Sequence, residues 1–186
     1  TDHVLLVVVH HIAVDGWSIG ILGAELHELY VAEAAGRVAN LPALELTYTD
    51  FVAWQQALLS SDEGQSLRTY WQQQLSGELP VLNLPLDRAR PTLQTYHGAS
   101  LDLELRPELV QALQALAREE HVTPYTLLLA GLQILLHKYS GQTDIVIGSP
   151  MAGRTRSEFQ AVVGYFVNPV VLRGDLSGDP TVRDYL

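Results

Sequence analysis

The hydrophobic pattern of the chain predicts four strands. Residues Val4–Val9 are all apolar and mostly β-branched, which is typical of a strand buried on both faces of a sheet. At 101–105, leucines alternate with acidic residues, which predicts a strand with one buried face. Two more strands are predicted at 145–147 and 167–172, and Pro169 marks the last as an edge or bulged strand.

Helices are predicted between these strands from apolar spacings of three and four residues. Their expected starts are Asp15, Tyr48, Ser60, Pro107 and Thr123. The spacing from Ser60 to Glu63 predicts a capping box. The helix from Thr123 to Tyr139 is apolar around its circumference, so we expect it to be largely buried. Strands that alternate with helices indicate a mixed α/β (α+β) fold.

A stretch rich in proline divides the chain. Residues 78–98 leave little room for regular structure and predict an extended connector between two lobes. We expect residues 1–77 to end one lobe and residues 99–186 to begin the next. Because a buried strand needs neighbours on both sides, the run at Val4–Val9 predicts that the chain begins inside a larger domain.

Composition narrows the function classes. The chain has 186 residues, enough for one domain or two small lobes. Eleven basic against twenty-one acidic residues give a net charge of −10, which argues against a nucleic-acid partner. The chain has no apolar run long enough to span a membrane. The absence of cysteine excludes disulfides and a cysteine nucleophile, and it fits a cytoplasmic protein.

The candidate chemistry lies where the first apolar run ends. If strand geometry continues through His10 and His11, their rings point to opposite faces, so they do not share a metal ion and no metal is expected. One imidazole is then placed for acid/base work, and the other is a buried structural ring. Asp15 lies where it could orient a ring or pair with a cation, and Gly16 permits a tight turn and leaves room near the site. The alternative is two core histidines bonded to backbone carbonyls, with Asp15 as a helix cap.

These residues carry a family resemblance. The segment His10–Ser18 resembles the HHxxxDG signature of the condensation domains of nonribosomal peptide synthetases, in the chloramphenicol-acetyltransferase-like superfamily. Three further stretches resemble conserved blocks in the family's order: Tyr48–Trp54, Leu86–Pro91 and Val163–Arg173. The resemblance covers essentially the whole chain. It implies a two-lobed sandwich, incomplete at both ends here, with HHxxxDG between the lobes.

The resemblance also implies the site residues. The catalytic segment comprises His10, His11, Asp15 and Gly16. Substrate contacts are expected from Trp17, Ser18 and Asn168. Asp15 needs a cationic partner if it is buried, and the segment from Ile12 to Gly23 contains no Lys or Arg. We therefore expect a structural ion pair with Arg154, the pairing to which the resemblance also points.

The activity implied by the resemblance is amide bond formation in nonribosomal peptide synthesis. A donor acyl or peptidyl thioester and an acceptor aminoacyl thioester are presented on phosphopantetheine of carrier proteins. The domain itself needs no cofactor. Its expected partners are the donor and acceptor peptidyl carrier domains and a neighbouring adenylation domain. His11 either removes the amine proton or holds the amine, and the isolated chain is expected to be inactive.

Two other functions stay open on the sequence. A related acyltransferase could use the same histidine to esterify a hydroxyl group. A non-catalytic docking domain could keep the fold and only recruit another protein.

Overall fold

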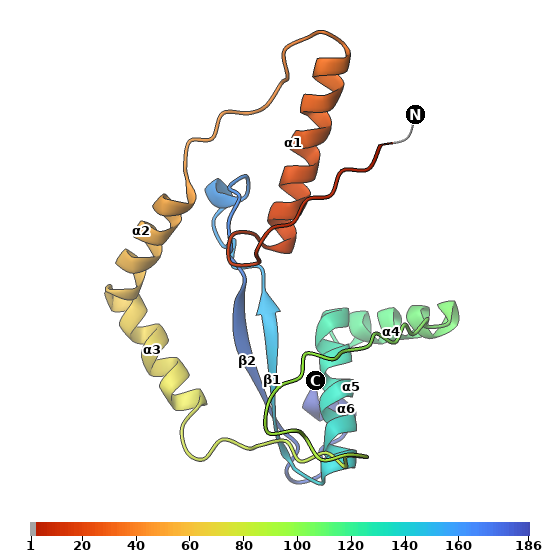
Figure 1. The fold of residues 1–186 in the computed structure, drawn as a ribbon. Helices are drawn as coiled ribbons and strands as arrows, with labels where there is room; N and C mark the ends of the chain where they lie inside the picture. The colour runs from red at the N-terminus through yellow and green to blue at the C-terminus, as the bar shows by residue number, and fades with distance from the viewer. Residues whose placement is uncertain (1–2) are drawn as a thin grey trace. The chain divides into compact units, whose positions relative to one another are not determined.

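The computed structural model describes residues 3–186, which fall into two compact units (Figure 1). The first unit comprises Thr1–Ser76 and Gly148–Val170, and the second comprises Gly77–Ile147 and Val171–Leu186. Both helices and strands are present, which confirms the mixed fold class. The expected lobe boundaries at residues 77 and 98 stay a prediction.

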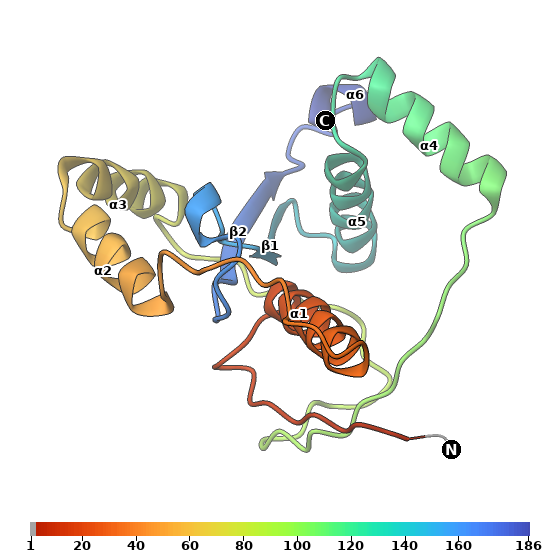
Figure 2. The same cartoon turned by 90° about the horizontal axis from the view of Figure 1, so that it is seen from above.

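The first unit holds three helices, and α1 and α3 begin at side-chain caps. The helix α1 (Gly16–Ala34) follows Asp15, whose carboxylate accepts the Ser18 N–H. The helix α2 (Tyr48–Leu59) follows Thr47 and packs against α3 (Asp62–Gln74), as Figure 2 shows. The cap of α3 is Ser61.

The capping box predicted at Ser60 is therefore wrong. The Ser60 hydroxyl donates to the Gln56 carbonyl and closes the end of α2. A capping box does form at the start of α2, where the Asp50 carboxylate accepts the Thr47 N–H at 2.7 Å.

The second unit holds three more helices, α4 (Pro107–Glu119), α5 (Pro124–Ser140) and α6 (Val182–Tyr185). The prediction that α5 is largely buried is wrong for the described chain, since Leu128 and Leu135 are each more than half exposed. Packing against α4 covers only part of the circumference of α5. No helix among residues 3–186 is long and apolar enough to cross a membrane.

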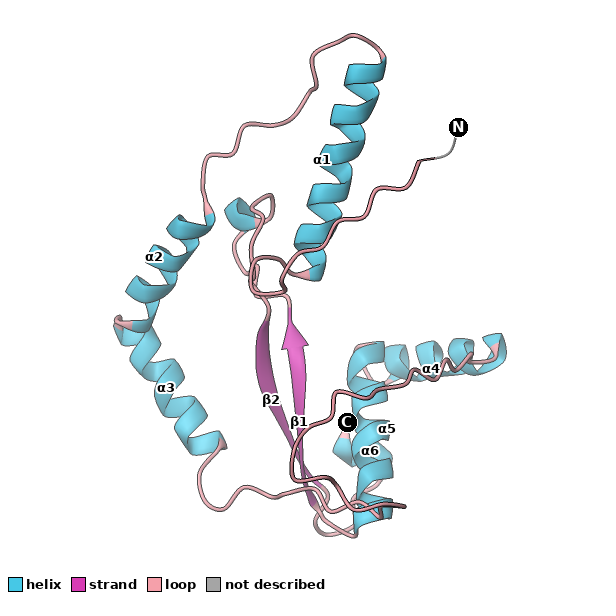
Figure 3. Ribbon diagram, viewed as in Figure 1, coloured by secondary structure: helices cyan, strands magenta, loops and turns pink. Residues whose placement is uncertain are grey.

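The strands β1 (Asp144–Met151) and β2 (Asn168–Asp175) pair in a two-stranded sheet, drawn in magenta in Figure 3. They confirm the predicted strands at 145–147 and 167–172. Pro169 lies near the start of β2, as its missing N–H requires.

The other two predicted strands are wrong. Residues Val4–Val9 and 101–105 have no strand structure, and Val4 and Leu101 are 95% and 84% exposed. A strand needs a neighbour for its backbone N–H and C=O groups. No strand of the described residues pairs with either segment.

The core of the first unit is aromatic. Phe51 of α2 packs with Phe159, Val162 and Phe166. The ring centroids of Phe51 and Phe166 are 4.5 Å apart. This cluster holds the segment from residue 159 to 166 against α2, and the same segment makes the contacts of the candidate site.

Candidate functional site

The two histidines lie in a turn. The Ala13 N–H donates to the His10 carbonyl at 3.0 Å, so the chain reverses at this point and does not continue as a strand. The prediction that the two rings point to opposite faces of a strand is therefore wrong. His10 is also exposed, not buried, and its Nδ1 accepts the Ile12 N–H at 3.1 Å.

The turn orients the His11 ring. Its Nδ1 lies 2.7 Å from the Val14 carbonyl oxygen. Because a carbonyl oxygen only accepts hydrogen bonds, Nδ1 carries the proton, and Nε2 of the neutral ring is left with a lone pair. The Tyr165 ring stands at 82° to the imidazole, with the centroids 5.4 Å apart. The geometry leaves His11 able to accept a proton or a hydrogen bond at Nε2.

Asp15 is buried directly behind this turn, with 1% of its surface exposed. Its Oδ1 accepts the Ser18 N–H at 2.8 Å, and its Oδ2 accepts the Phe166 N–H at 3.1 Å. Burial favours the neutral acid, but the hydrogen bonds from Ser18, Phe166 and Arg154 outweigh it and lower the pKa of Asp15. The carboxylate is thus held ionised inside the first unit.

Arg154 is the cation that faces this carboxylate. Its Nη2 lies 3.2 Å from Asp15 Oδ1, within the roughly 4 Å of an ion pair. Both side chains are almost fully buried. Nη2 also donates to the Ser18 hydroxyl, and Nη1 donates to the carbonyls of Phe159 and Val162, each at 2.7 Å. The structure therefore brings the expected partners together and ties them to the loop before β2.

Ser18 belongs to this buried network. Its side chain is fully buried, and its hydroxyl donates to the Gly164 carbonyl at 2.8 Å and accepts the Gly164 N–H at 3.0 Å. The expectation that Ser18 contacts substrate is wrong, because the hydroxyl is bonded on all sides and shielded. Ser18 instead fastens α1 to the segment that contains Gly164.

The remaining expected site residues lie at the surface. Gly16 is the first residue of α1, and an added Cβ there would meet no atom within 4 Å. Its φ is not positive, so the expected tight turn does not require glycine. Trp17 is 51% exposed, and its indole N–H donates to the Gln160 carbonyl at 3.0 Å. Asn168 is exposed at the start of β2.

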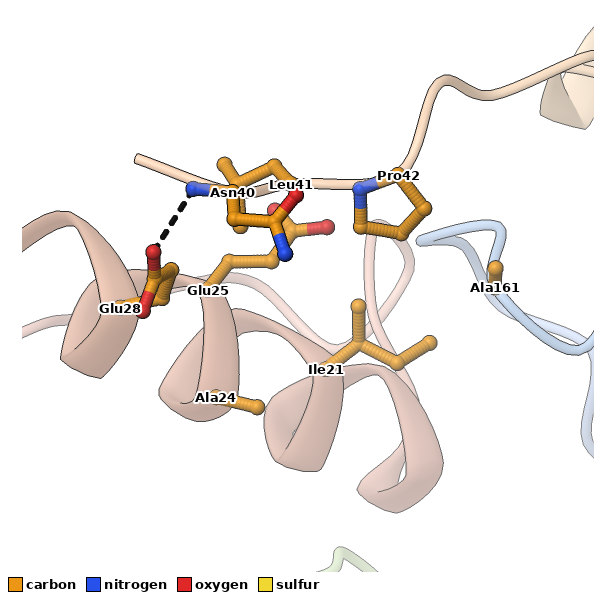
Figure 4. Close-up of a pocket in the computed structure, with 8 residues that line it drawn as sticks. All are labelled: Ile21, Ala24, Glu25, Glu28, Asn40, Leu41, Pro42 and Ala161. Carbon is orange, nitrogen blue, oxygen red and sulfur yellow. Dashed lines mark hydrogen bonds between the residues drawn. The ribbon is translucent and has the colours of Figure 1, made fainter. Parts of the chain in front are cut away.

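A separate groove of about 420 Å³ runs along α1 (Figure 4). Ile21 and Leu41 line it. Glu28 and Asn40 also line it, and the Glu28 carboxylate accepts the Asn40 N–H. Bonds from Arg37 and then Asn40 lower the pKa of Glu28 to about 2. The groove contains none of the expected site residues. Across residues 3–186, no group of three His, Cys, Asp or Glu side chains could hold a metal ion.

The family model "Condensation domain" matches residues 1–186. The chain belongs to the condensation-domain family. It is 41% identical over 184 residues to tyrocidine synthase 3 of Brevibacillus parabrevis, covering 99% of this chain and 3% of that protein.

Two solved structures resemble this condensation-domain chain over 95% of its length. One is the X-domain of teicoplanin biosynthesis in complex with OxyB, with a TM-score of 0.83, 30% identity and 40% of that chain covered. The other is the first condensation domain of the calcium-dependent antibiotic synthetase with a substrate analogue, with a TM-score of 0.73, 27% identity and 38% covered. The chain therefore spans well under half of these solved relatives.

The sequence did not predict the backbone hydrogen bonds of this condensation-domain site. The Gly164 carbonyl accepts the Asp15 N–H, and the Phe166 N–H reaches the Asp15 carboxylate. Backbone groups have no side-chain signature. The one sequence feature that pointed to this segment was the family resemblance of the block from Val163 to Arg173. That resemblance did not assign a role to Gly164 or Phe166.

Proposed function

We propose that the complete condensation domain containing this chain joins two carrier-bound substrates through an amide bond. The observation that carries the proposal is the His11 ring, whose Nδ1 is tethered to the Val14 carbonyl and whose Nε2 is left as an acceptor. The acceptor amine attacks the donor thioester carbonyl, so a C–N bond forms and the C–S bond breaks. The amine loses a proton and the departing sulfur gains one, so the donor carrier leaves as its phosphopantetheine thiol.

His11 serves this reaction in one of two ways. An imidazole at physiological pH can take the amine proton directly. It can also hold the amine by a hydrogen bond in the attacking geometry, and oriented reactants gain about 7–11 kcal/mol in barrier. Both roles use the lone pair at Nε2.

Asp15 and Arg154 form a structural ion pair in this proposal. Hydrogen bonds from Ser18, Phe166 and Arg154 engage both carboxylate oxygens of Asp15. Its lowered pKa also makes it a poor proton acceptor. The pair braces the turn that presents His11, and Asp15 carries no proton in the reaction.

We assign the substrate contacts to two exposed residues, Trp17 and Asn168. Trp17 offers an aromatic face that is 51% exposed, and Asn168 offers an exposed amide. The open space beside Gly16 leaves room for the acceptor. Donor and acceptor peptidyl carrier domains are the proposed partners, with an adenylation domain next to them, and the domain itself binds no cofactor.

Likeness to the X-domain, which was solved in complex with OxyB, favours a second candidate function. In this case the domain recruits another protein and does no chemistry. The turn and the buried ion pair would then be kept for stability, and His11 would have no part in turnover.

One reconstitution separates these functions. The complete domain is mixed with donor-loaded carrier protein and with acceptor carrier loaded with either an aminoacyl or a hydroxyacyl group, and the products are identified by mass spectrometry. An amide from the amine acceptor at a rate above the enzyme-free control supports the proposal. Ester formation alone indicates the O-acyltransferase, and no product in a folded protein indicates docking.

A further inference from the structure

The Tyr165 ring is the aromatic neighbour of the His11 imidazole. The two rings meet edge to face, with centroids 5.4 Å apart. This separation is typical of favourable aromatic pairs. Tyr165 is half-buried and lies far from His11 in the sequence, so the contact depends entirely on tertiary structure.

The backbone on both sides of Tyr165 is fixed to Asp15. Before it, the Gly164 carbonyl accepts the Asp15 N–H at 3.2 Å. After it, the Phe166 N–H donates to the Asp15 carboxylate at 3.1 Å. The Tyr165 carbonyl itself accepts the Tyr48 hydroxyl at 2.6 Å. Tyr165 therefore has little freedom to move away from the turn that carries His11.

Two contacts then define the position of the imidazole. The Val14 carbonyl holds Nδ1 at 2.7 Å, and Tyr165 stands against the ring. The Cβ–Cγ bond and one hydrogen bond still let the ring rock about its side-chain torsions, whereas a second contact on the ring restricts this motion. The second contact therefore keeps Nε2 pointing in one direction.

We propose that Tyr165 is a positioning residue for His11. Its aromatic ring holds the imidazole in the orientation that presents Nε2 to the acceptor amine. The proposal rests on the proposed amide-forming function for its effect on rate. The effect on the ring itself is independent of that function. The ring of Tyr165, not its hydroxyl, does this, so phenylalanine can replace it.

The kinetic test uses a double-mutant cycle in the complete domain with loaded carriers. We expect Tyr165→Ala to lower the single-turnover rate about tenfold and Tyr165→Phe to stay within about twofold of wild type. Because Tyr165 acts through His11, adding Tyr165→Ala to His11→Ala should change the residual rate by less than about twofold. Tyr139→Ala, at a tyrosine that is 63% exposed on α5, is the matched control.

A spectroscopic test separates failure of this proposal from failure of the proposed function. The ¹³C–¹H relaxation of the labelled histidine ring reports how rigidly the His11 imidazole is held, and its signals are assigned by their loss in His11→Ala. We expect an ordered ring in wild type and Tyr165→Phe, and a more mobile ring in Tyr165→Ala. If the complete domain forms no amide, the proposed function fails, and the spectra alone decide the role of Tyr165.

The proposal is overturned by either of two results. One is a His11 ring that stays as ordered in Tyr165→Ala as in wild type. The other applies if His11→Ala lowers the single-turnover rate. It is an equal fold-loss of that rate on adding Tyr165→Ala to wild type and to His11→Ala, because the effect of Tyr165 would then not depend on the His11 ring.

Discussion

At the scale of single residues, Asp15 shows how a polar group is stabilised inside the first unit. Its carboxylate is 1% exposed yet ionised, because Ser18, Phe166 and Arg154 all donate to it. Its native pKa lies below the ordinary value of 3.8, so the unfolded chain takes up the proton more readily. The contribution of Asp15 to the free energy of unfolding is therefore fully present above about pH 3.8, and it is lost as the pH falls through the lower pKa of the native state.

Replacing Asp15 by Asn in the complete domain should expose this contribution. We expect the free energy of unfolding at neutral pH to fall by roughly 3–5 kcal/mol, as for other broken buried pairs. The difference from wild type should shrink as the pH falls below 3.8, where the carboxylate begins to be protonated. Urea unfolding at several pH values measures both.

The matched control is Asp144→Asn, because Asp144 pairs with Arg173 at a site where both side chains are partly exposed. Loss of such a surface pair should cost at most about 1 kcal/mol. Equal losses for the two variants at neutral pH would show that the Asp15 pair is not a buried brace.

The Asp15–Arg154 contact could be predicted because the sequence around Asp15 already shows that this carboxylate lacks a nearby cation. A buried carboxylate requires a cation, and the sequence around Asp15 has none. The partner lies 139 positions away, and its place in the loop after a predicted strand, together with the family resemblance, indicated which arginine it was. The position of the His11 ring could not be predicted, since it depends on a turn at His10 where the apolar run indicated a strand.

At the scale of elements, the segment before β2 joins the aromatic core to the site. Gly164 lies against Tyr48 of α2, and a Cβ added to it would come within 2.2 Å of the Tyr48 ring. Its N–H and C=O are both bonded to the Ser18 hydroxyl. This position therefore couples the packing of α2 to the start of α1.

The variant Gly164→Ala should force these elements apart. We expect a loss of about 1–3 kcal/mol in unfolding free energy, as for other overpacked positions. Gly20→Ala in α1 is the control, because its Cβ would meet no atom within 4 Å. That change should be neutral or stabilise the helix by up to about 1 kcal/mol. Thermal unfolding of both variants measures these changes in stability. A Gly164→Ala variant as stable as wild type would contradict the close packing.

Helices were better predicted than strands, for a physical reason. A helix satisfies its backbone within its own segment, so caps such as Thr123 and stops such as Gly141 are visible locally. A strand needs a partner. The run at Val4–Val9 has the composition of a buried strand, but no strand of the described residues pairs with it.

At the scale of the whole molecule, this chain covers 38–40% of the solved relatives described above. It leaves large apolar side chains exposed, among them Val4, Leu6 and Val8, each more than 80% exposed. Contiguous apolar surface of this kind promotes association.

Residues 1–186 produced alone should therefore fold poorly or aggregate. We expect binding of a hydrophobic dye and elution as aggregates in size-exclusion chromatography, because unpaired apolar segments template association. A monomer with a sharp cooperative melt would show that the segment is self-sufficient. The complete domain is the control for the same measurements.

His11 is proposed to serve amide formation from a turn that the Asp15–Arg154 pair braces. The direct measurement is the rate of amide product from loaded carriers in the complete domain, for wild type, His11→Ala and His10→Ala. We expect His11→Ala to lower the rate by about a hundredfold or more with an unchanged melt. His10→Ala should have a small effect, because its exposed ring makes only a local hydrogen bond to Ile12. A folded His11→Ala domain that forms amide at the wild-type rate would contradict the account.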